Sequence, residues 1–244
     1  MTHNYWRYTA AVLYFCCLGC TKFNHSGSAT LTIVNALDSN SYLITDFEPF
    51  GQKSDLAVPL QYFATANQVY YGNSWESGSY VDSVSLSLFQ GTDTVTALWA
   101  GNLYLPQGSI HTLFLSGDTV SVDTLLTTDI IPYYSNSDSV AGVRFVNLSK
   151  GSLPMTVDLQ GNPPTQFEFS NLGYRQISNF KQYNASSNAP QAGYTFEIRD
   201  QESGTLLTTI SWSYLVFMNT TIVVDGSENP ATLTPIQAFQ VNNF

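Results

Sequence analysis

Alternation of apolar and polar residues with a period of two most constrains the fold of this chain. Residues 29–37, ATLTIVNAL, place Leu31 and Ile33 on one face of an extended strand. Residues 81–89, VDSVSLSLF, alternate valine or leucine with serine. Such patterns are typical of β-strands with one buried face and one solvated face. Further strands are predicted at 94–99, 110–115 and 119–126, with a tight turn at 116–119.

The strand pattern of the first half recurs in the second half. GVRFVNL at 142–148 matches TLTIVNA, and the hairpin-like segment 194–210 matches VSLSLFQGTDTVTALWA. NTTIVVDGSENPATL at 219–233 then matches GSIHTLFLSGDTVSV. The offset of roughly 110 residues is the size of one small β-sandwich. We therefore predict an all-β chain of two tandem immunoglobulin-like or transthyretin-like antiparallel β-sandwich domains, at 29–138 and 139–244, with the boundary in the polar segment 133–140.

A short apolar run, TAAVLYFCCL, precedes Gly19 and Cys20. A run of about ten residues is too short for a membrane-spanning helix, which needs about 20, but it fits the core of a secretory signal peptide. The Gly-Cys pair resembles the lipobox of bacterial lipoproteins, in which the cysteine is acylated and becomes the mature N-terminus. The resemblance implies lipid attachment at Cys20, removal of residues 1–19 and a tether over 20–28. An ordinary secretory signal and an uncleaved structural segment are the alternatives.

The three cysteines, Cys16, Cys17 and Cys20, also have the short spacing that thiolate metal ligands use. Structural zinc normally takes four ligands, and His25 is the only nearby residue that could add one. We therefore expect no metal and no cofactor. If the leader is removed, the remaining cysteine is blocked by lipid, so core packing rather than a disulfide must stabilise the exported chain.

The charge balance is acidic, with 18 Asp and Glu against 8 Lys and Arg and a formal net charge of -10. The basic residues do not cluster along the chain. An anionic surface repels nucleic-acid phosphates and anionic headgroups. We expect no nucleic-acid partner and no peripheral membrane binding through a basic patch.

Three stretches of the second half together resemble a known bacterial family: AGVRFVNLSKGSLPMTVDLQG at 141–161, AGYTFEIRD at 192–200 and NTTIVVDG at 219–226. They are similar to the family catalogued as domain of unknown function 4397. The resemblance covers 141–226 and, more weakly, 29–131. It implies an exported or lipid-anchored protein with one or more β-sandwich modules, and it implies no enzymatic activity.

Catalytic signals in the sequence are weak. His111 lies in a predicted strand and is interpreted as a half-exposed strand residue. Asp46 and Glu48 share a strand face and are a weak candidate for the paired carboxylates of a glycan hydrolase. Four aspartates in turn-like contexts are expected to bond the local backbone rather than calcium: Asp38, Asp118, Asp138 and Asp225. We expect that the protein is not an enzyme.

Aromatic residues are densest in QYFATANQVYYGNSWESGSY at 61–80. Rings interleaved with amides and hydroxyls can form a surface on which sugars stack. The candidate ligand-binding residues are Tyr70, Tyr71, Trp75 and Tyr80. The alternative is that these rings fill a core or an interface between the domains.

The expected function is a non-enzymatic, lipid-anchored cell-envelope protein that acts as a binding or scaffold module for glycans or an envelope protein. Its expected location is the bacterial outer membrane, on the periplasmic face or the cell surface. The alternative is a fimbrial or adhesin-type structural subunit that assembles by strand addition through TPIQAFQVNNF at 234–244. The same segment also fits the last strand of the second domain.

Overall fold

The computed structural model describes residues 29–37, 42–47, 58–60, 73–77, 83–163, 166–227 and 234–243. Every regular element in these ranges is a β-strand, which confirms the predicted all-β class. Within the same ranges, no helix has the length and apolar character needed to cross a membrane. The predicted leader and tether, residues 1–28, lie outside the described residues.

The first half of the chain forms two sheets, which we name A and B. Sheet A has the strand order β4 (Asn73–Ser77), β1 (Ala29–Leu37), β7 (Ile110–Gly117), β8 (Val122–Thr128). Sheet B has the order β3 (Val58–Leu60), β2 (Leu43–Asp46), β5 (Ser83–Gln90), β6 (Asp93–Tyr104). All pairs are antiparallel except β1 and β7, which run parallel.

The second half forms sheets C and D with the same topology. Sheet C has the order β12 (Gln176–Ile177), β9 (Val140–Asn147), β16 (Asn219–Asp225), β17 (Gln237–Asn243), and β13 (Lys181–Asn184) also pairs with β9. Sheet D has the order β11 (Phe167–Leu172), β10 (Met155–Leu159), β14 (Tyr194–Asp200), β15 (Leu206–Trp212). Again one pair is parallel, β9 with β16.

The two parallel strand pairs, β1 with β7 and β9 with β16, have matching registers. Thr30 of β1 lies opposite Ile110 of β7, and Gly142 of β9 lies opposite Asn219 of β16. Corresponding residues of the two parallel pairs are therefore 112 and 109 positions apart. The recurring sequence pattern thus corresponds to the same pairing of strands in both halves.

Each half has its own hydrophobic core between its two sheets. The first contains Leu31 and Ile33 together with Leu86, Leu88, Leu113 and Leu115. The second is aromatic: it contains Phe145, Phe196 and Trp212, and the Phe145 and Phe196 rings meet edge to face at 5.2 Å. The predicted inward face of 29–37 is confirmed by the burial of Leu31 and Ile33.

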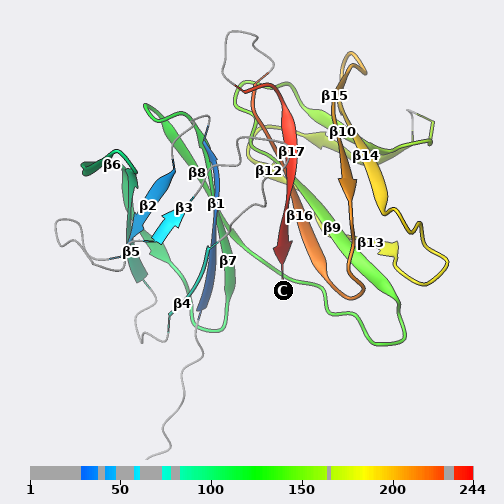
Figure 1. Ribbon diagram of the computed structural model, residues 1–244, viewed down its shortest axis with the longest axis horizontal. Helices are drawn as coiled ribbons and strands as arrows, with labels where there is room; N and C mark the ends of the chain where they lie inside the picture. The colour runs from blue at the N-terminus through cyan, green and yellow to red at the C-terminus, as the bar shows by residue number, and fades with distance from the viewer. Residues whose placement is uncertain are drawn as a thin grey trace, which may run out of the picture.

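A third hydrophobic cluster joins sheet A to sheet C. It contains Val34, Ala36 and Phe114 from the first half and Val146, Leu148, Val223, Phe239 and Val241 from the second half. The four sheets therefore stack in the order B, A, C, D (Figure 1). The prediction of one solvated face is wrong for β1, because Val34 and Ala36, on the face opposite Leu31, are fully buried against the other half.

One hairpin turn differs from its prediction, and the C-terminal segment forms the last strand, one of the two roles considered for it. The turn predicted at 116–119 lies between β7 and β8 at residues 118–121, because the Asp118 carboxylate accepts the amide hydrogens of Val120 and Ser121 and closes the turn there. The C-terminal segment forms β17, which pairs with β16 along its whole length, from Gln237 to Asn243. In this structure it is the last strand of its own sheet.

Candidate functional site

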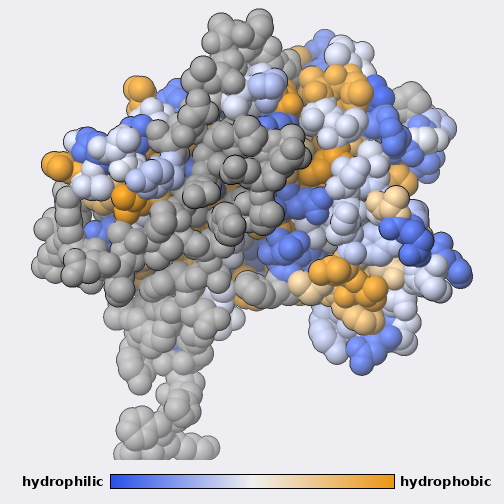
Figure 2. All heavy atoms as spheres, in the orientation of Figure 1, coloured by the Kyte–Doolittle hydropathy of each residue, from blue (hydrophilic) through white to orange (hydrophobic). Residues whose placement is uncertain are grey.

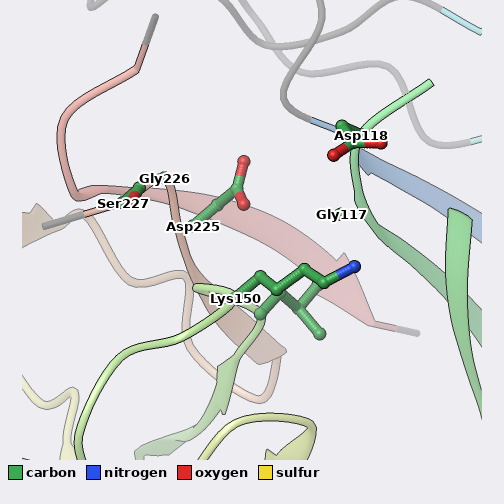
Figure 3. A pocket seen from close by; sticks show the side chains of 7 residues that line it. Gly117, Asp118, Lys150, Asp225, Gly226 and Ser227 are labelled. Atoms are coloured by element: carbon green, nitrogen blue, oxygen red, sulfur yellow. The ribbon is translucent and has the colours of Figure 1, made fainter. Parts of the chain in front are cut away.

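A pocket of about 130 Å³ opens where the β7–β8 turn of the first half meets the ends of β9 and β16 in the second half. Figure 3 shows Lys150 and Asp225 from the second half and Asp118 from the first half around this space. The described lining residues are Gly117, Asp118, Leu148, Lys150, Asp225, Gly226 and Ser227. Both halves of the repeat are therefore needed to form it.

Two glycines shape the backbone of this pocket. Gly117 ends β7 with a φ of 88°, and Gly226 follows β16 with a φ of 95°. These left-handed conformations disfavour residues that carry a Cβ. A Cβ at Gly117 would also collide with the carbonyl oxygen of Ser121, and one at Gly226 with that of Pro235. Glycine at both positions lets the two chain segments turn away and leaves the pocket open.

Lys150 connects the pocket to the first half of the chain. Its ammonium lies 3.1 Å from Asp123 Oδ2 and donates a hydrogen bond to Ser121 Oγ at 3.3 Å. The Tyr174 hydroxyl donates to the same Asp123 oxygen at 2.8 Å. The hydrogen bond from Tyr174, followed by the charge and hydrogen bond of Lys150, lowers the pKa of Asp123. Two side chains of the second half, Lys150 and Tyr174, therefore bind the Asp123 carboxylate of the first half beside the pocket.

The pKa of Tyr174 is shifted as well. This residue follows β11, and its hydroxyl also lies 3.0 Å from Ser116 Oγ. Burial, with a smaller effect of the neighbouring Asp123 carboxylate, raises the pKa of Tyr174 to about 12. The phenol therefore stays protonated as a donor throughout the physiological pH range.

A buried ion pair links the halves at the opposite end of the interface from the pocket. Arg144 of β9 lies 2.9 Å from the carboxylate of Asp129, which directly follows β8. Thr112 and Thr127 donate hydrogen bonds to the same carboxylate at 2.5 and 2.9 Å. Arg144 also donates to Thr221 Oγ1 at 2.8 Å, and its guanidinium lies 4.6 Å from the centre of the Phe180 ring. These contacts fix the orientation of one sandwich against the other.

The pocket can bind, through hydrogen bonds and charge, a small polar group. Asp118 and Asp225 contribute two carboxylates against the single ammonium of Lys150, which Asp123 already neutralises. The balance favours a neutral or cationic group over an anion. Among the described residues, no group of three or more His, Cys, Asp or Glu side chains could hold a metal ion.

A second hollow, of about 250 Å³, lies within the second half at the β14–β15 hairpin. Asp200 accepts hydrogen bonds there from the amide and hydroxyl of Ser203, and these bonds lower its pKa. Oδ1 of the carboxylate therefore closes its own turn, while Oδ2 is buried with no hydrogen-bond partner among the described residues.

The site residues predicted from sequence fall mostly outside the described part of the chain. Cys20, Tyr70, Tyr71 and Tyr80 are not among the described residues, and neither are Asp38 and Glu48. For Trp75 the structure describes the backbone, which lies in β4 opposite Leu31. β4 is an edge strand of sheet A, so the backbone of Trp75 lies at the boundary of that sheet.

The interpretation of His111 as half-exposed is wrong. The residue lies in β7 as predicted, but it is 3% exposed. One ring nitrogen lies 2.7 Å from Ser109 Oγ and the other 3.1 Å from the Thr127 carbonyl oxygen. His111 shares the face of β7 that carries Leu113 and Leu115, and this face is buried toward the first core.

The turn interpretation of the aspartates holds for two of them. Asp118 accepts the amides of its own turn, and Asp138 accepts the amide of Ser135 at 2.8 Å. Asp225 differs because it is the last residue of β16, paired with Gln237 and buried beside the pocket. Sequence reasoning missed Lys150 and the Asp129–Arg144 pair; the available signal was an arginine inside the apolar run GVRFVNL.

Comparison with known proteins gives no family. No family model matches the chain, and no curated protein matches it. A candidate adhesin from Bacteroides ovatus is 10% identical with a TM-score of 0.23, over 87% of this chain and 95% of that one. A leucine-rich repeat protein from Bacteroides thetaiotaomicron is 14% identical with a TM-score of 0.19, over 88% of this chain and 27% of that one. Both TM-scores are too low to indicate a shared fold or function.

Proposed function

We propose that this chain is a non-enzymatic cell-envelope protein, anchored to the outer membrane by a lipid on Cys20, whose two sandwiches form one rigid binding or scaffold module. The observation that carries the proposal is the interface between sheets A and C. There the third hydrophobic cluster and the Asp129–Arg144 pair bury the second faces of β1, β7, β9 and β16, whose first faces line the two cores. A module built in this way holds its surfaces at a fixed spacing, as a scaffold requires.

Membership of the family catalogued as domain of unknown function 4397 is part of this proposal. Its support is the sequence of 141–161, 192–200 and 219–226, which forms most of β9, β10, β14 and β16. The same strand order in both halves supports the view that the chain is a tandem of one module.

The anchor is tested by mass spectrometry of the protein isolated from a bacterial envelope. The expected N-terminal peptide begins at Cys20 and carries acyl chains, and the Cys20→Ala variant leaves the membrane fraction. A soluble mature form that retains Cys17 would refute the anchor. The matched control is Ser28→Ala, a change in the same predicted tether that leaves the cysteine intact.

Glycan binding through the aromatic segment is the finer part of the proposal. Tyr70, Tyr71, Trp75 and Tyr80 supply rings and hydroxyls suited to stacking on and bonding with sugars. A glycan array should lose its signals with Trp75→Ala and keep them with Tyr133→Ala, a change at an aromatic residue that is 91% exposed in the linker. Equal binding by both variants would show that the aromatic segment is not the site.

Assembly by strand addition is the alternative function, and one observation bears on it. β17 is the edge strand of sheet C, so its outer edge is a place where a neighbouring copy could pair or exchange a strand. Exchange would have to break the full-length pairing with β16 and expose Phe239 and Val241, which are buried between the halves. A polymer ladder at high concentration, with fast hydrogen exchange in β17, would favour this alternative; a monomer with protected β17 amides would exclude it.

A further inference from the structure

One end of the molecule, which we name the tether end, is formed by residues 105–109, 129–139, 185–193 and 213–218. The Ala185 amide donates to the Ser139 carbonyl oxygen and the Tyr214 hydroxyl donates to that of Pro190, which joins the last three segments. The Thr30 amide donates to the Ser109 carbonyl oxygen at 2.9 Å, and the Asp129 amide donates to that of Ile110. Asn219, just after 213–218, bonds the hydroxyl of Tyr134 and the carbonyl oxygen of Pro132. In Figure 1 the linker between β8 and β9 and the connection between β15 and β16 lie along the lower side of the molecule.

The tether end is almost free of charge. Its four segments contain two charged residues, Asp129 and Asp138, and Asp129 is buried against Arg144. The opposite end has a different character, since its described turns carry Asp118, Lys150 and Glu202 together with the polar pocket. For a chain with a net charge of -10, this is an uneven distribution.

Large apolar side chains are exposed to solvent at the tether end. Leu215, Val216 and Phe217 are consecutive and are 64%, 41% and 38% exposed. In the linker, Ile130 is 87% exposed. Figure 2 shows an apolar cluster over the connection between β15 and β16, at the lower right. Contiguous exposed apolar residues of this kind mark a surface that contacts another apolar phase.

Phe217 occupies a backbone position that disfavours it. Its φ is 67°, in the left-handed region, where a bulky residue is rare. In the first half, Gly108 holds the equivalent position two residues before the parallel pair, with a φ of 78°. The second half thus carries a strained aromatic residue where glycine serves in the first half. Strain of this type is retained where the side chain has a use.

The backbone of this loop is suited to an apolar surrounding. The Phe217 amide donates to the carbonyl oxygen of Val140 at 2.8 Å, and the Met218 amide donates to that of Leu215 at 3.1 Å. An amide without a partner could not enter hydrocarbon, because no water is available there to bond it. These two donors are already satisfied within the protein.

The predicted tether places this end near a bilayer. Residues 21–28 separate Cys20 from Ala29, the first residue of β1. Eight residues span at most about 30 Å when fully extended. If Cys20 carries the lipid, as proposed above, β1 begins within that distance of the membrane surface.

We propose that the tether end docks onto the lipid bilayer and that Leu215, Val216 and Phe217 enter its interfacial region. The partner is the apolar interior of the membrane, because the tether end offers apolar side chains and no basic residue for headgroup phosphates. Docking would orient the molecule, with the pocket around Lys150 directed away from the membrane. This inference rests on the proposed lipid anchor for its geometry.

The test uses the full chain reconstituted in phosphatidylcholine vesicles with brominated acyl chains, which quench nearby indoles. Leu215→Trp places an indole in the loop, and Val120→Trp places one in the β7–β8 turn at the opposite end, where Val120 is 95% exposed. We expect most of the emission added by Leu215→Trp to be lost in brominated vesicles, and the emission added by Val120→Trp to be unchanged. Equal quenching of the two, or none, would overturn the proposal.

Two further measurements separate this inference from others. Acylation of Cys20 is read by mass on the same samples, so quenching of Leu215→Trp without acylation would support the docking end and refute the anchor. A blue shift of Leu215→Trp emission that grows with protein concentration in lipid-free solution would identify a second copy as the partner and overturn membrane docking. Far-UV circular dichroism of both variants confirms that the strands are intact.

Discussion

The guanidinium of Arg144 lies 2.9 Å from the carboxylate of Asp129, and the two side chains are 6% and 0% exposed. The two residues belong to different halves of the repeat. Two threonine hydroxyls complete the bonding of the carboxylate, and Thr221 accepts a bond from the guanidinium. The pair therefore specifies how sheet A sits on sheet C, while the surrounding apolar side chains supply most of the stabilisation.

Breaking this pair should be strongly destabilising. Arg144→Met leaves the Asp129 carboxylate buried without its counter-ion, and we expect it to lower the free energy of unfolding by about 3–5 kcal/mol. Urea denaturation measures the change. The control is Lys181→Met, which removes a partly exposed partner of Glu168 and should cost less than about 1 kcal/mol. Similar losses for both variants would contradict a special role of the buried pair.

Truncation of the apolar interface should uncouple the halves. Phe114 of β7 is fully buried in the third hydrophobic cluster, and Phe114→Ala should cost about 3–5 kcal/mol through lost burial and a cavity. Because both cores remain intact, we expect calorimetry to resolve two unfolding transitions instead of one. Val95→Ala, at a residue that is 80% exposed, should change stability by no more than about 0.5 kcal/mol. A single transition in Phe114→Ala would show that the halves remain coupled without it.

Acid should weaken the contact at the pocket rim. The pKa of Asp123 is lowered in the folded state by Tyr174 and then by Lys150, so its contribution to stability is present above the unfolded pKa near 4. That contribution is lost as the pH falls through the lower folded pKa. Unfolding experiments between pH 5 and pH 2 should therefore show a shallower decline for Asp123→Asn than for the wild type. Parallel declines would contradict the assignment.

Alkali should act on the same contact through Tyr174, whose pKa is raised to about 12. The unfolded phenol ionises near pH 10, so the contribution of Tyr174 is complete below that pH and is lost as the pH rises through the folded value. Tyr174→Phe should remove the part of the pH dependence of stability that comes from Tyr174 and leave the part that comes from the other tyrosines. Its stability should therefore fall less than that of the wild type between pH 10 and pH 12, as followed by circular dichroism.

The backbone strain at Phe217 can be separated from its side chain. Because φ is 67° there, Phe217→Gly should be more stable than Phe217→Ala by about 1 kcal/mol. Gly108→Ala should lose about 1–2 kcal/mol in the first half, where a Cβ would contact nothing within 4 Å and only the backbone is strained. Gly173→Ala, at a position without a positive φ, is the control. Equal stability of the two Phe217 variants would show that the loop relaxes without strain.

The candidate site was largely beyond the reach of sequence reasoning. Lys150 and Asp225 lie far apart in the chain and meet only because β9 and β16 pair in parallel. Asp118 joins them only because sheet A packs on sheet C. Asp225 has a turn-like sequence context but ends a buried strand, so its neighbours in the sequence do not disclose its role.

The sequence by itself determined the all-β class, the inward face of 29–37 and the recurrence of one strand pattern at an interval of about 110 residues. These features depend on neighbouring residues, because side chains alternate between the two faces of any strand. A sequence pattern that recurs along the chain forms the same pairs of strands in each copy. Only the tertiary structure decided that the second faces of β1 and β7 are also buried and that the pocket has both halves as its walls. The physical reason is that burial of a second face depends on which sheet packs against it, and that contact is made between residues distant in the sequence.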